Sequence, residues 1–258
     1  SPLTRTLIRF QVLMTMGLLL TTGAWAGPPR LELAWKSEGT AQYFLLSEDA
    51  AADRVGGPLD PGLTAPLGSL WKLFMYVYLT DRVREIPEYR CDGENPKEEA
   101  FCCEGGGGIG ADEALVRSCG LFFQPSRLRI TPEAWREYWR PLAPPSAQWL
   151  MDLVPLQPET SVSVSSLLEA LAAIPPRPRQ QAEQTLLNLL FTSRAEGLAL
   201  YWGGRMRVKT WTWDHPAGKG LRVGGFAGWL ADGTPIWARG EGSSASILQR
   251  WAPAISLW

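Results

Sequence analysis

The sequence predicts an α+β fold in which one antiparallel sheet is formed from both ends of the chain and is flanked by helices. Strand-type stretches follow residue 26, helix-type segments fill the middle, and further strand-type stretches follow residue 196. This order is met most simply when the C-terminal strands return to the N-terminal pair and the central helices form an inserted subdomain. A cleft between the sheet and the inserted helices is then the natural place for a ligand.

The chain is long enough for a sizeable hydrophobic core and carries little net charge. It has 258 residues, 45% of them hydrophobic, and a formal net charge of −1 at pH 7. No long basic or acidic run occurs, so nothing in the composition points to nucleic acid as a partner. The composition fits one globular domain, or one domain with a large insertion.

Residues 1–26 have the pattern of a secretory signal peptide. Arg5 and Arg9 precede an uncharged run whose strongly apolar part is residues 12–20, and the sequence Ala-Trp-Ala at residues 24–26 resembles a cleavage site. The apolar part is shorter than the roughly 20 residues that a membrane span needs. The sequence therefore predicts export to the periplasm, with an uncleaved membrane anchor as the alternative.

Four cysteines lie within one short segment: Cys91, Cys102, Cys103 and Cys119. An even number of cysteines in an exported chain favours two disulfides, and the sequence leaves three pairings open. A zinc site is disfavoured, because adjacent Cys102 and Cys103 suit a tetrahedral ion poorly and the single histidine, His215, is distant. We expect neither a metal nor a cofactor.

The first predicted unit after the signal, residues 27–66, supplies the N-terminal strands. The stretches "LELAWK" (31–36) and "AQYFLL" (41–46) have the alternation and composition of strands. The Gly- and Pro-rich stretch 51–68 is predicted to be a loop, and residues 70–83 a helix.

The second predicted unit, residues 67–195, contains the active-site helix and an interrupted helical subdomain. Residues 89–110 are predicted to be a loop. Thr131 followed by Pro132 is a good helix start. The short helix or turn and the three helices that follow the loop are expected at residues 111–123, 131–142, 163–174 and 179–197.

The third predicted unit, residues 196–258, changes to strand character. Gly, Asp and Pro turns separate its β-rich stretches. Its four strands are predicted at residues 197–204, 205–214, 221–230 and 234–240. Residues 243–255 are predicted to be a closing helix.

Thirteen tryptophans are an unusual content for a chain of this length. Most are expected to fill the core, because aromatic side chains dominate packing and are favoured in strands. A stacking groove for a glycan or peptide is the alternative.

The candidate chemistry begins at "GSLWK", where Ser69 and Lys72 are three residues apart at the start of a predicted helix. Residues i and i+3 share a helix face, so the Lys72 amine is expected beside the Ser69 hydroxyl. A lysine kept neutral by desolvation or by a second cation can take the serine proton. The free N–H groups at a helix start can stabilise an oxyanion. Taken alone, the tetrapeptide favours a capping serine and a surface lysine.

Two further segments are "GGGGIGADEALVRSCGLFF" and "MRVKTWTWDHP". Taken with "PLGSLWKLF", they resemble the penicillin-binding protein and serine β-lactamase (transpeptidase-like) superfamily. Members carry S-x-x-K, S-x-N and K-T-G-T in this order. The corresponding residues here are Ser69 with Lys72, Ser118-Cys119-Gly120, and Lys209-Thr210-Trp211-Thr212. The later "GGFAGWLADGTPIWA" resembles the strand pair that follows the third motif. The resemblance implies a β-lactamase/transpeptidase-like fold and a divergent, secreted bacterial branch.

The resemblance implies a role for each matched residue. Ser69 is the expected acylated nucleophile, Lys72 its general base, and Ser118 the relay of a proton toward the leaving group. Lys209 and Thr210 are expected to hold a substrate carboxylate. The backbone N–H groups of Ser69 and Thr212 are expected to form the oxyanion hole.

Two departures from the motifs bear on activity. Gly120 stands where the family has a substrate-binding asparagine, and Trp211 stands where a glycine lets the substrate backbone approach the strand. The indole of Trp211 would either fill the cleft or tilt away as a wall, and it shares a strand face with Trp213. The expected substrate-binding residues are Thr210, Trp211, Thr212, Gly120 and Trp213.

The resemblance implies an exported serine acyltransferase or peptidase of the DD-transpeptidase/carboxypeptidase type. Its implied substrate is a peptide that ends in a carboxylate, such as a peptidoglycan stem peptide. No glutamate context matches the deacylating glutamate of class A β-lactamases, and Glu159 in "QPETS" is disfavoured for that role. A peptidase or transpeptidase is therefore expected rather than a β-lactamase.

The alternative is a catalytically inactive binding module with the same fold. Such a module would hold a cell-wall peptide or a periplasmic protein, for example an α2-macroglobulin-like protein. An extended peptide would pair along the strand at residues 207–213 by strand addition.

Overall fold

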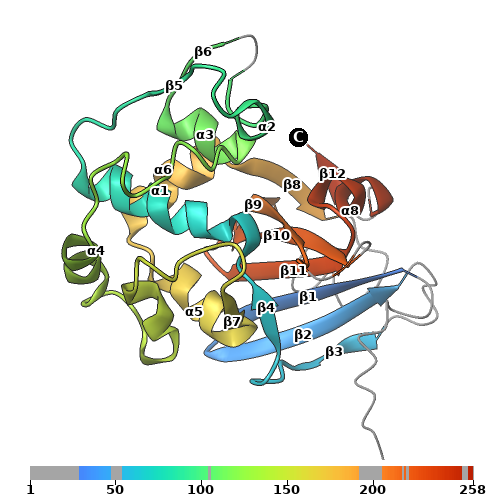
Figure 1. The fold of residues 1–258 in the computed structure, drawn as a ribbon. Helices are drawn as coiled ribbons and strands as arrows, with labels where there is room; N and C mark the ends of the chain where they lie inside the picture. The colour runs from blue at the N-terminus through green and yellow to red at the C-terminus, as the bar shows by residue number, and fades with distance from the viewer. Residues whose placement is uncertain are drawn as a thin grey trace, which may run out of the picture.

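A computed structural model describes residues 29–47, 54–103, 106–191, 205–216, 218, 221–251 and 255–257. The predicted signal peptide, residues 1–26, and the predicted strand at 197–204 lie outside the described residues. Most helices gather on one side of a large antiparallel sheet (Figure 1). No helix among the described residues combines the length and the apolar content that a bilayer crossing requires.

The large sheet contains strands from both ends of the chain, which confirms the predicted fold class. Its eight strands have the order β12-β8-β9-β10-β11-β1-β2-β3. The N-terminal strand β1 pairs with the C-terminal strand β11, where Ala34 lies opposite Trp237, and also with β2. The bounds of the strands are β1 Arg30–Ser37, β2 Thr40–Ser47, β3 Arg54–Pro58, β8 Leu187–Phe191, β9 Arg205–Asp214, β10 Arg222–Leu230, β11 Pro235–Glu241 and β12 Ile255–Leu257.

Helices and two small sheets make up the rest of the described chain. The small sheets pair β4 Thr64–Pro66 with β7 Ser161–Ser163, and β5 Tyr89–Cys91 with β6 Gly107–Ile109. The α-helices are α1 Trp71–Arg82, α2 Pro96–Glu99, α3 Ala111–Arg117, α4 Pro132–Trp139, α5 Val164–Ala173, α6 Pro176–Thr185 and α8 Ser244–Arg250. Two 3₁₀ helices are η2 Gly68–Leu70 and η3 Pro145–Met151.

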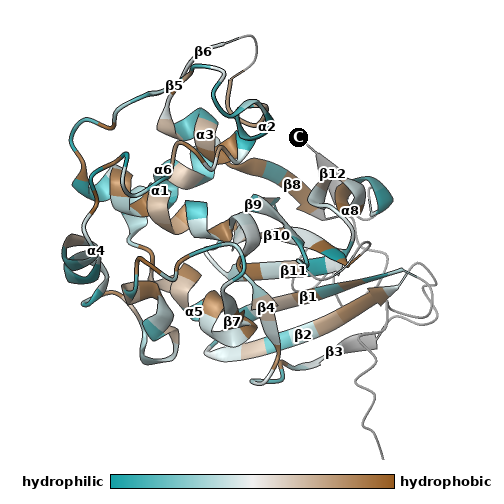
Figure 2. Ribbon diagram, viewed as in Figure 1, coloured by the Kyte–Doolittle hydropathy of each residue, from teal (hydrophilic) through white to brown (hydrophobic). Residues whose placement is uncertain are grey.

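Side chains alternate between the two faces of the sheet along each strand, and a hydrophobic cluster covers each face. On β1, Leu31, Leu33 and Trp35 pack in the cluster that includes Ile247 of α8, whereas Ala34 packs on the side of the other helices. Hydrophobic colouring accordingly runs along β1 and β2 (Figure 2). A sheet covered on both faces holds the strands that carry the candidate site in fixed positions.

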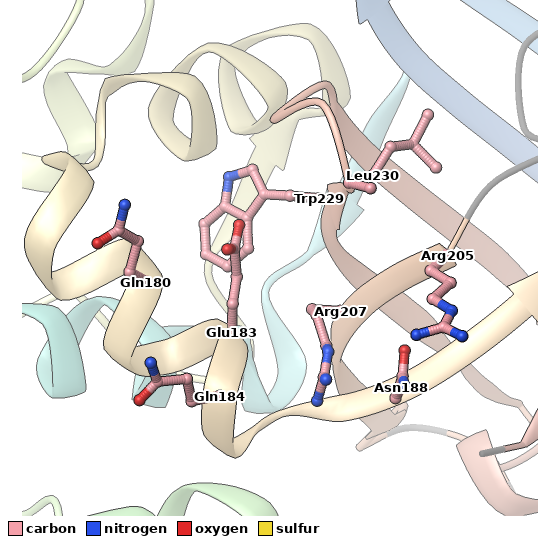
Figure 3. A pocket seen from close by; sticks show the side chains of 9 residues that line it. Gln180, Glu183, Gln184, Asn188, Arg205, Arg207, Trp229 and Leu230 are labelled. Atoms are coloured by element: carbon pink, nitrogen blue, oxygen red, sulfur yellow. The ribbon is translucent and has the colours of Figure 1, made fainter.

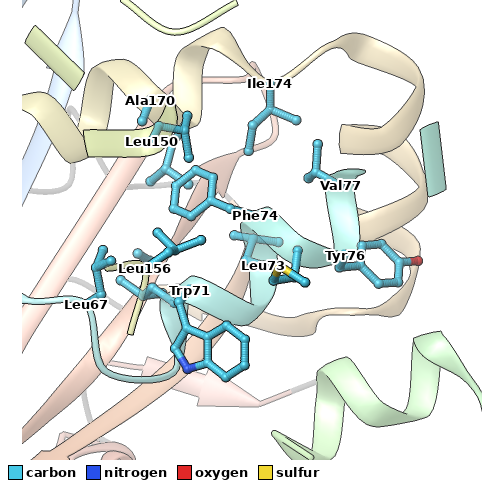
Figure 4. Close-up of a cluster of buried hydrophobic side chains, with 14 of the residues drawn as sticks. Leu67, Trp71, Leu73, Phe74, Tyr76, Val77, Leu150, Leu156, Ala170 and Ile174 are labelled. Atoms are coloured by element: carbon cyan, nitrogen blue, oxygen red, sulfur yellow. The ribbon is translucent and has the colours of Figure 1, made fainter. Parts of the chain in front are cut away.

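Helix α1 is enclosed on nearly all sides. Residues 71–79 are buried, as expected for a helix surrounded by other elements. Phe74 points toward Leu150 (Figure 4) and meets the ring of Trp149 edge-on at 5.5 Å between centroids. This packing holds the first turn of α1, and with it Lys72, in place.

The four cysteines form two disulfides, as predicted, and the pairing is Cys91–Cys103 and Cys102–Cys119. The second bond joins the end of the loop after α2 to the residue that follows Ser118. Two candidate walls of the site are thereby covalently tied.

The predicted helix at residues 179–197 is confirmed as far as Thr185 and is wrong for residues 187–191, while its last part, 192–197, lies outside the described residues. Helix α6 ends at Thr185, and the apolar run that follows forms β8, which pairs with β9 and β12. A short apolar run fits a helix or a strand equally well, and pairing decided between them. The sheet therefore resumes before the boundary predicted between residues 195 and 196.

Two predicted loops contain short regular elements. Residues 51–68 include β3 and β4, and residues 89–110 include β5, α2 and β6. The predicted closing helix at 243–255 ends at Arg250 and is followed by β12. The remaining predicted helices and described strands match within a few residues, except that α3 ends at Arg117 and is followed by turns.

Candidate active site

Ser69 lies in a tight turn that the surrounding loop and sheet hold. Gly68 has φ +52°, a left-handed conformation that favours glycine. Its N–H donates to the Pro158 carbonyl at 2.9 Å, and the N–H of Leu67 donates to the Thr160 carbonyl at 2.9 Å. Ser69 therefore enters helix η2 on a backbone that is fixed from outside.

Lys72 reaches Ser69 from the first turn of α1. Its Nζ lies 3.4 Å from the Ser69 Oγ and donates to the Ser118 carbonyl at 2.8 Å. Only 8% of Lys72 is exposed. Burial lowers the pKa of Lys72 to about 8, while the charge of Glu98 acts in the opposite direction. A lysine with this pKa can be neutral in mildly alkaline solution and can accept a proton.

Ser118 is the point where the second and third motifs meet. It ends α3 in the left-handed conformation with φ +60°. Its Oγ accepts a hydrogen bond from Nζ of Lys209 on β9. Lys209 is 1% exposed and also donates to the Thr210 carbonyl at 3.0 Å. Burial, followed by the charge of Lys72, lowers the pKa of Lys209 to about 7.

The structure thus brings Ser69, Lys72, Ser118 and Lys209 together, although they are far apart in the sequence. Each contacts the next: Ser69 contacts Lys72, Lys72 contacts Ser118, and Ser118 contacts Lys209. A hydroxyl beside a desolvated amine is the arrangement of an activated nucleophile. A second hydroxyl beside a second desolvated amine can pass on a proton.

Trp211 is part of the core rather than a filler of the cleft. It is 1% exposed and stacks on Trp237, with 6.3 Å between ring centroids. A Cβ atom at Gly68 would lie only 3.0 Å from its ring. The indole therefore packs beneath the turn that carries Ser69.

The other predicted substrate-binding residues of β9 point in different directions. The Oγ1 of Thr212 accepts a hydrogen bond from the Ser244 N–H at 2.9 Å, so this hydroxyl contacts the first residue of α8. Thr210 is half-buried, and half-buried Trp213 packs edge-on against His215, with 5.1 Å between the ring centroids. None of these side chains is among those that line the cleft described below.

The edge of β9 is paired only over its first residues. Asn188 pairs with Arg207 and Leu187 with Val208, after which the ladder between β8 and β9 ends. The predicted strand addition along residues 207–213 is therefore wrong for its first two residues. No strand among the described residues pairs with this edge from Lys209 onward.

Gly120 lies beside the amine of Lys72. A Cβ atom placed on it would be 3.7 Å from Lys72 Cε and 3.9 Å from Nζ, which is ordinary contact distance. A side chain is therefore sterically possible at this position, and both Gly120 and Lys72 belong to the lining of the cleft described below.

A cleft of about 750 Å³ reaches Lys72, Ser118 and Gly120. Ser69 is half-buried and adjoins it through Lys72. The cleft is lined by Trp71, Lys72, Glu98, Phe101, Ser118, Gly120, Gln124, Pro125, Ser126, Ile130, Pro132, Leu153, Val154, Leu156, Gln157 and Pro158. Sequence reasoning missed Phe101 and Val154, because no local pattern distinguishes an exposed apolar side chain from a buried one.

A second hollow of about 350 Å³ lies between α6, β8, β9 and β10. Arg205, Arg207 and Asn188 gather at one side of it, and Gln180 and Glu183 lie along α6 (Figure 3). It contains none of the residues of the candidate active site.

The fold is that of serine β-lactamases and penicillin receptors, which confirms the predicted resemblance at the level of the fold. A class D β-lactamase from Fusobacterium nucleatum has a TM-score of 0.51 and 13% identity, over 86% of this chain and 87% of that chain. The C-terminal domain of the Bacillus licheniformis BlaR penicillin-receptor has a TM-score of 0.50 and 13% identity, over 86% and 89%. A class D β-lactamase from Sebaldella termitidis has a TM-score of 0.50 and 11% identity, over 87% and 86%.

Residues 94–217 match the family described as "Predicted secreted protein (DUF2300)". The chain is also 42% identical over 238 residues to "Uncharacterized protein YfaQ" of Escherichia coli (strain K12). That match covers 92% of this chain and 42% of the relative, so the chain spans less than half of that protein's length. The family description and the two disulfides support export.

Proposed function

We propose that the protein is an exported serine acyltransferase or peptidase that works through an acyl-enzyme on Ser69, with the periplasm as its compartment. The observation that carries this proposal is the position of the buried Lys72 amine, 3.4 Å from the Ser69 hydroxyl. This amine has the lowered pKa that a general base needs. The proposal is supported by the fold, which is similar to a class D β-lactamase and to a penicillin-receptor domain.

In the proposed acylation, the Ser69 Oγ attacks a carbonyl carbon and its proton moves to neutral Lys72. The new bond joins Oγ to the acyl carbon, and the bond to the leaving nitrogen or oxygen breaks. The leaving group takes the Ser118 hydroxyl proton, and Ser118 is reprotonated by the Lys209 ammonium that is hydrogen-bonded to it. The pKa of Lys209, about 7, suits this acid role near neutrality.

In the proposed deacylation, water or an amine attacks the acyl carbon and the bond to Ser69 breaks. The attacking group loses its proton to Lys209 by way of Ser118, and Ser69 regains its proton from Lys72. Both lysines thereby return to their starting states. Glu159 is exposed and is not among the residues that line the cleft, which agrees with its disfavoured role.

The test is covalent labelling by a fluorescent penicillin and by a phosphonate ester that reacts with activated serines. We expect one mole of adduct per mole of protein on Ser69, and no adduct with Ser69→Ala. If folded wild-type protein takes neither reagent, the proposed enzyme is refuted.

We propose a binding module as the second candidate, because no strand of the described part of the chain pairs with the edge of β9 from Lys209 to Asp214, and an extended peptide could pair there. The peptidoglycan stem peptide and the α2-macroglobulin-like protein are the ligands that this proposal would take. If wild-type protein is not labelled by either reagent, binding of one of these ligands to Ser69→Ala supports the module.

A further inference from the structure

The cleft beside Ser69 offers no accessible cation among the described residues that line it. Lys72 is buried, and its amine is already bonded to the Ser118 carbonyl. Glu98 is exposed on the wall and is the other charged residue of the lining. Lys209, which was expected to hold a carboxylate, is 1% exposed and bonded to Ser118. A substrate carboxylate in this cleft would therefore face Glu98 without an accessible counter-charge.

The hydroxyls of the third motif do not replace the missing cation. Thr212 Oγ1 is engaged by Ser244 on the far face of β9. Thr210 is half-buried and supplies an uncharged hydroxyl at most. Neither residue lines the cleft.

Two exposed apolar side chains flank the cleft. Phe101 is 64% exposed and Val154 is 71% exposed, while the third exposed large apolar residue of the described chain, Val116, lies outside the cleft. Phe101 directly precedes the disulfide-bonded Cys102, and the Val154 carbonyl accepts from Gln157 Nε2 at 3.2 Å. Large apolar groups exposed on a fixed backbone are typical of a surface that binds a partner.

The walls combine apolar surface with uncharged hydrogen-bonding groups. The apolar part is lined by Trp71, Ile130, Leu153 and Leu156, together with three prolines. Exposed Gln124, Ser126 and Gln157 lie among them. Such side chains can pair with the amides of a peptide, whereas a hydrocarbon chain would leave them without partners. The volume of about 750 Å³ has room for several residues.

We infer that this cleft receives an uncharged, apolar stretch of a polypeptide chain, and that Ser69 acts on an internal bond of that chain rather than beside a C-terminal carboxylate. The reaction in this inference rests on the proposed function; the ligand class rests on the composition of the cleft. The carboxylate-ended stem peptide implied by the family resemblance becomes the competing outcome.

Three phosphonate esters with one common leaving group test the inference. Their tails are a capped Phe-Leu dipeptide, the same dipeptide with Asp in place of Leu, and an alkyl chain of similar length. We expect the Phe-Leu ester to label Ser69 about tenfold faster than the Asp ester, which corresponds to the burial of one large apolar side chain. Equal or faster labelling by the Asp ester overturns the inference.

Rim variants separate the effect of the cleft from the reactivity of the ester. Phe101→Ser with Val154→Ser is expected to slow the Phe-Leu ester by about five- to tenfold. Val116→Ser is the matched control, because it removes an apolar side chain that is 51% exposed and lies outside the cleft, and it should change no rate. Equal slowing of the alkyl ester and the Phe-Leu ester would assign the cleft to a hydrocarbon chain and overturn the polypeptide.

Glu98→Gln tests the charge argument. At pH 10, where Lys72 is neutral with or without the charge of Glu98, it is expected to speed the Asp ester about threefold more than the Phe-Leu ester, as for the removal of one exposed like charge. The absence of this difference contradicts the assigned role of Glu98.

A binding measurement distinguishes failure of the inference from failure of the proposed function. If no ester labels wild-type protein, the enzyme proposal fails and the cleft is tested by fluorescence anisotropy with a dansylated, C-terminally amidated Phe-Leu-Phe peptide. Binding that is weakened by the Phe101 and Val154 changes, but not by Val116→Ser, supports the ligand class. Absence of binding to wild-type protein overturns it.

Discussion

The Lys72 amine lies 3.4 Å from the Ser69 Oγ, and burial lowers the pKa of Lys72 to about 8. Only the neutral amine can take the serine proton, so the rate of Ser69 labelling by the Phe-Leu phosphonate should rise with pH and reach half its maximum near pH 8. The common leaving group of the esters is chosen to depart as an anion, so that loss of the Lys209 proton does not limit this rate. Glu98→Gln should move the midpoint to lower pH, because the charge of Glu98 holds the proton on Lys72. Labelling rates measured from pH 6 to pH 10 check both shifts.

Lys72→Arg and Lys72→Met are the controls for this profile. Arginine stays charged, so Lys72→Arg should lower the rate by about 100-fold or more and remove the rise with pH. Between the folded pKa of about 8 and the ordinary value of 10.5, the unfolded chain binds a proton that the folded chain does not. Stability should therefore increase with pH across this interval, and less steeply in Lys72→Met. A pH-independent rate in wild-type protein contradicts the role of Lys72.

Gly68 should be the least replaceable glycine of the site. Gly68→Ala places a methyl group 3.0 Å from the Trp211 ring and 3.1 Å from the Thr212 carbonyl, in a residue with φ +52°. We expect it to lower the free energy of unfolding by about 2 kcal/mol and to slow Ser69 labelling. Urea titration and the labelling rate are the measurements.

Gly39→Ala is the matched control for backbone strain alone. Gly39 also has a positive φ, +80°, but a Cβ atom there meets nothing within 4 Å. Its cost should be about 1 kcal/mol, with no change in labelling. If both variants behave alike, the contact with Trp211 does not position Ser69.

Sequence reasoning could place Ser69 beside Lys72, because the distance between i and i+3 on a helix is a local property. It could not decide where the indole of Trp211 points, because that depends on Trp237, a residue of another strand. The exposure of Phe101 and Val154 was equally out of reach, since nothing local distinguishes an exposed apolar side chain from a buried one.

Among the structural elements, the disulfide Cys102–Cys119 has the closest link to the site. It closes a segment with a sequence separation of 17 and ends on the residue next to Ser118. Removing it with Cys102→Ser and Cys119→Ser should cost about 3 kcal/mol of stability by loop entropy. It should also slow Ser69 labelling, because the contacts of Ser118 with Lys72 and Lys209 are loosened.

The disulfide Cys91–Cys103 provides the comparison, with a sequence separation of 12. Its removal should cost a similar amount of stability by the same loop entropy. It should leave labelling nearly unchanged at temperatures where the variant stays folded. The measurements are thermal unfolding and the labelling rate of each variant. Equal loss of labelling in both variants would show that the effect on Ser118 is not specific to the disulfide Cys102–Cys119.

At this scale the sequence predicts elements well where a local pattern is strong, as at Thr131 and Pro132, which begin α4 with a cap bond from the Ala134 N–H to the Thr131 side chain. It fails where partners decide. The run that forms β8 is apolar enough for a helix, and only its neighbours β9 and β12 make it a strand. Pairing of β4 with β7, almost a hundred residues apart, has no local signal either.

For the whole molecule, the return of the C-terminal strands to the N-terminal pair was predictable, because the order of strands and helices leaves the two ends with incomplete sheets. An ion pair between a buried carboxylate and a partly exposed guanidinium marks this junction. Glu32 of β1 lies directly opposite Arg239 of β11, with 2.5 Å between Arg239 Nε and Glu32 Oε2. Arg239 also donates to the Thr64 carbonyl at 3.0 Å, just before the segment that leads to Ser69.

A double-mutant cycle on this pair tests how the closure of the sheet supports the site. Glu32→Leu or Arg239→Met alone leaves a buried charge unpaired and should cost about 3–5 kcal/mol, whereas both changes together should cost much less than their sum. Urea unfolding gives the three differences. Ser69 should be labelled more slowly in the double variant than in wild-type protein, although no charge is left unpaired. The reason is that Arg239→Met removes the hydrogen bond from Arg239 to the Thr64 carbonyl. Strictly additive costs, or full labelling in the double variant, would show that the ion pair and the turn before Ser69 are independent.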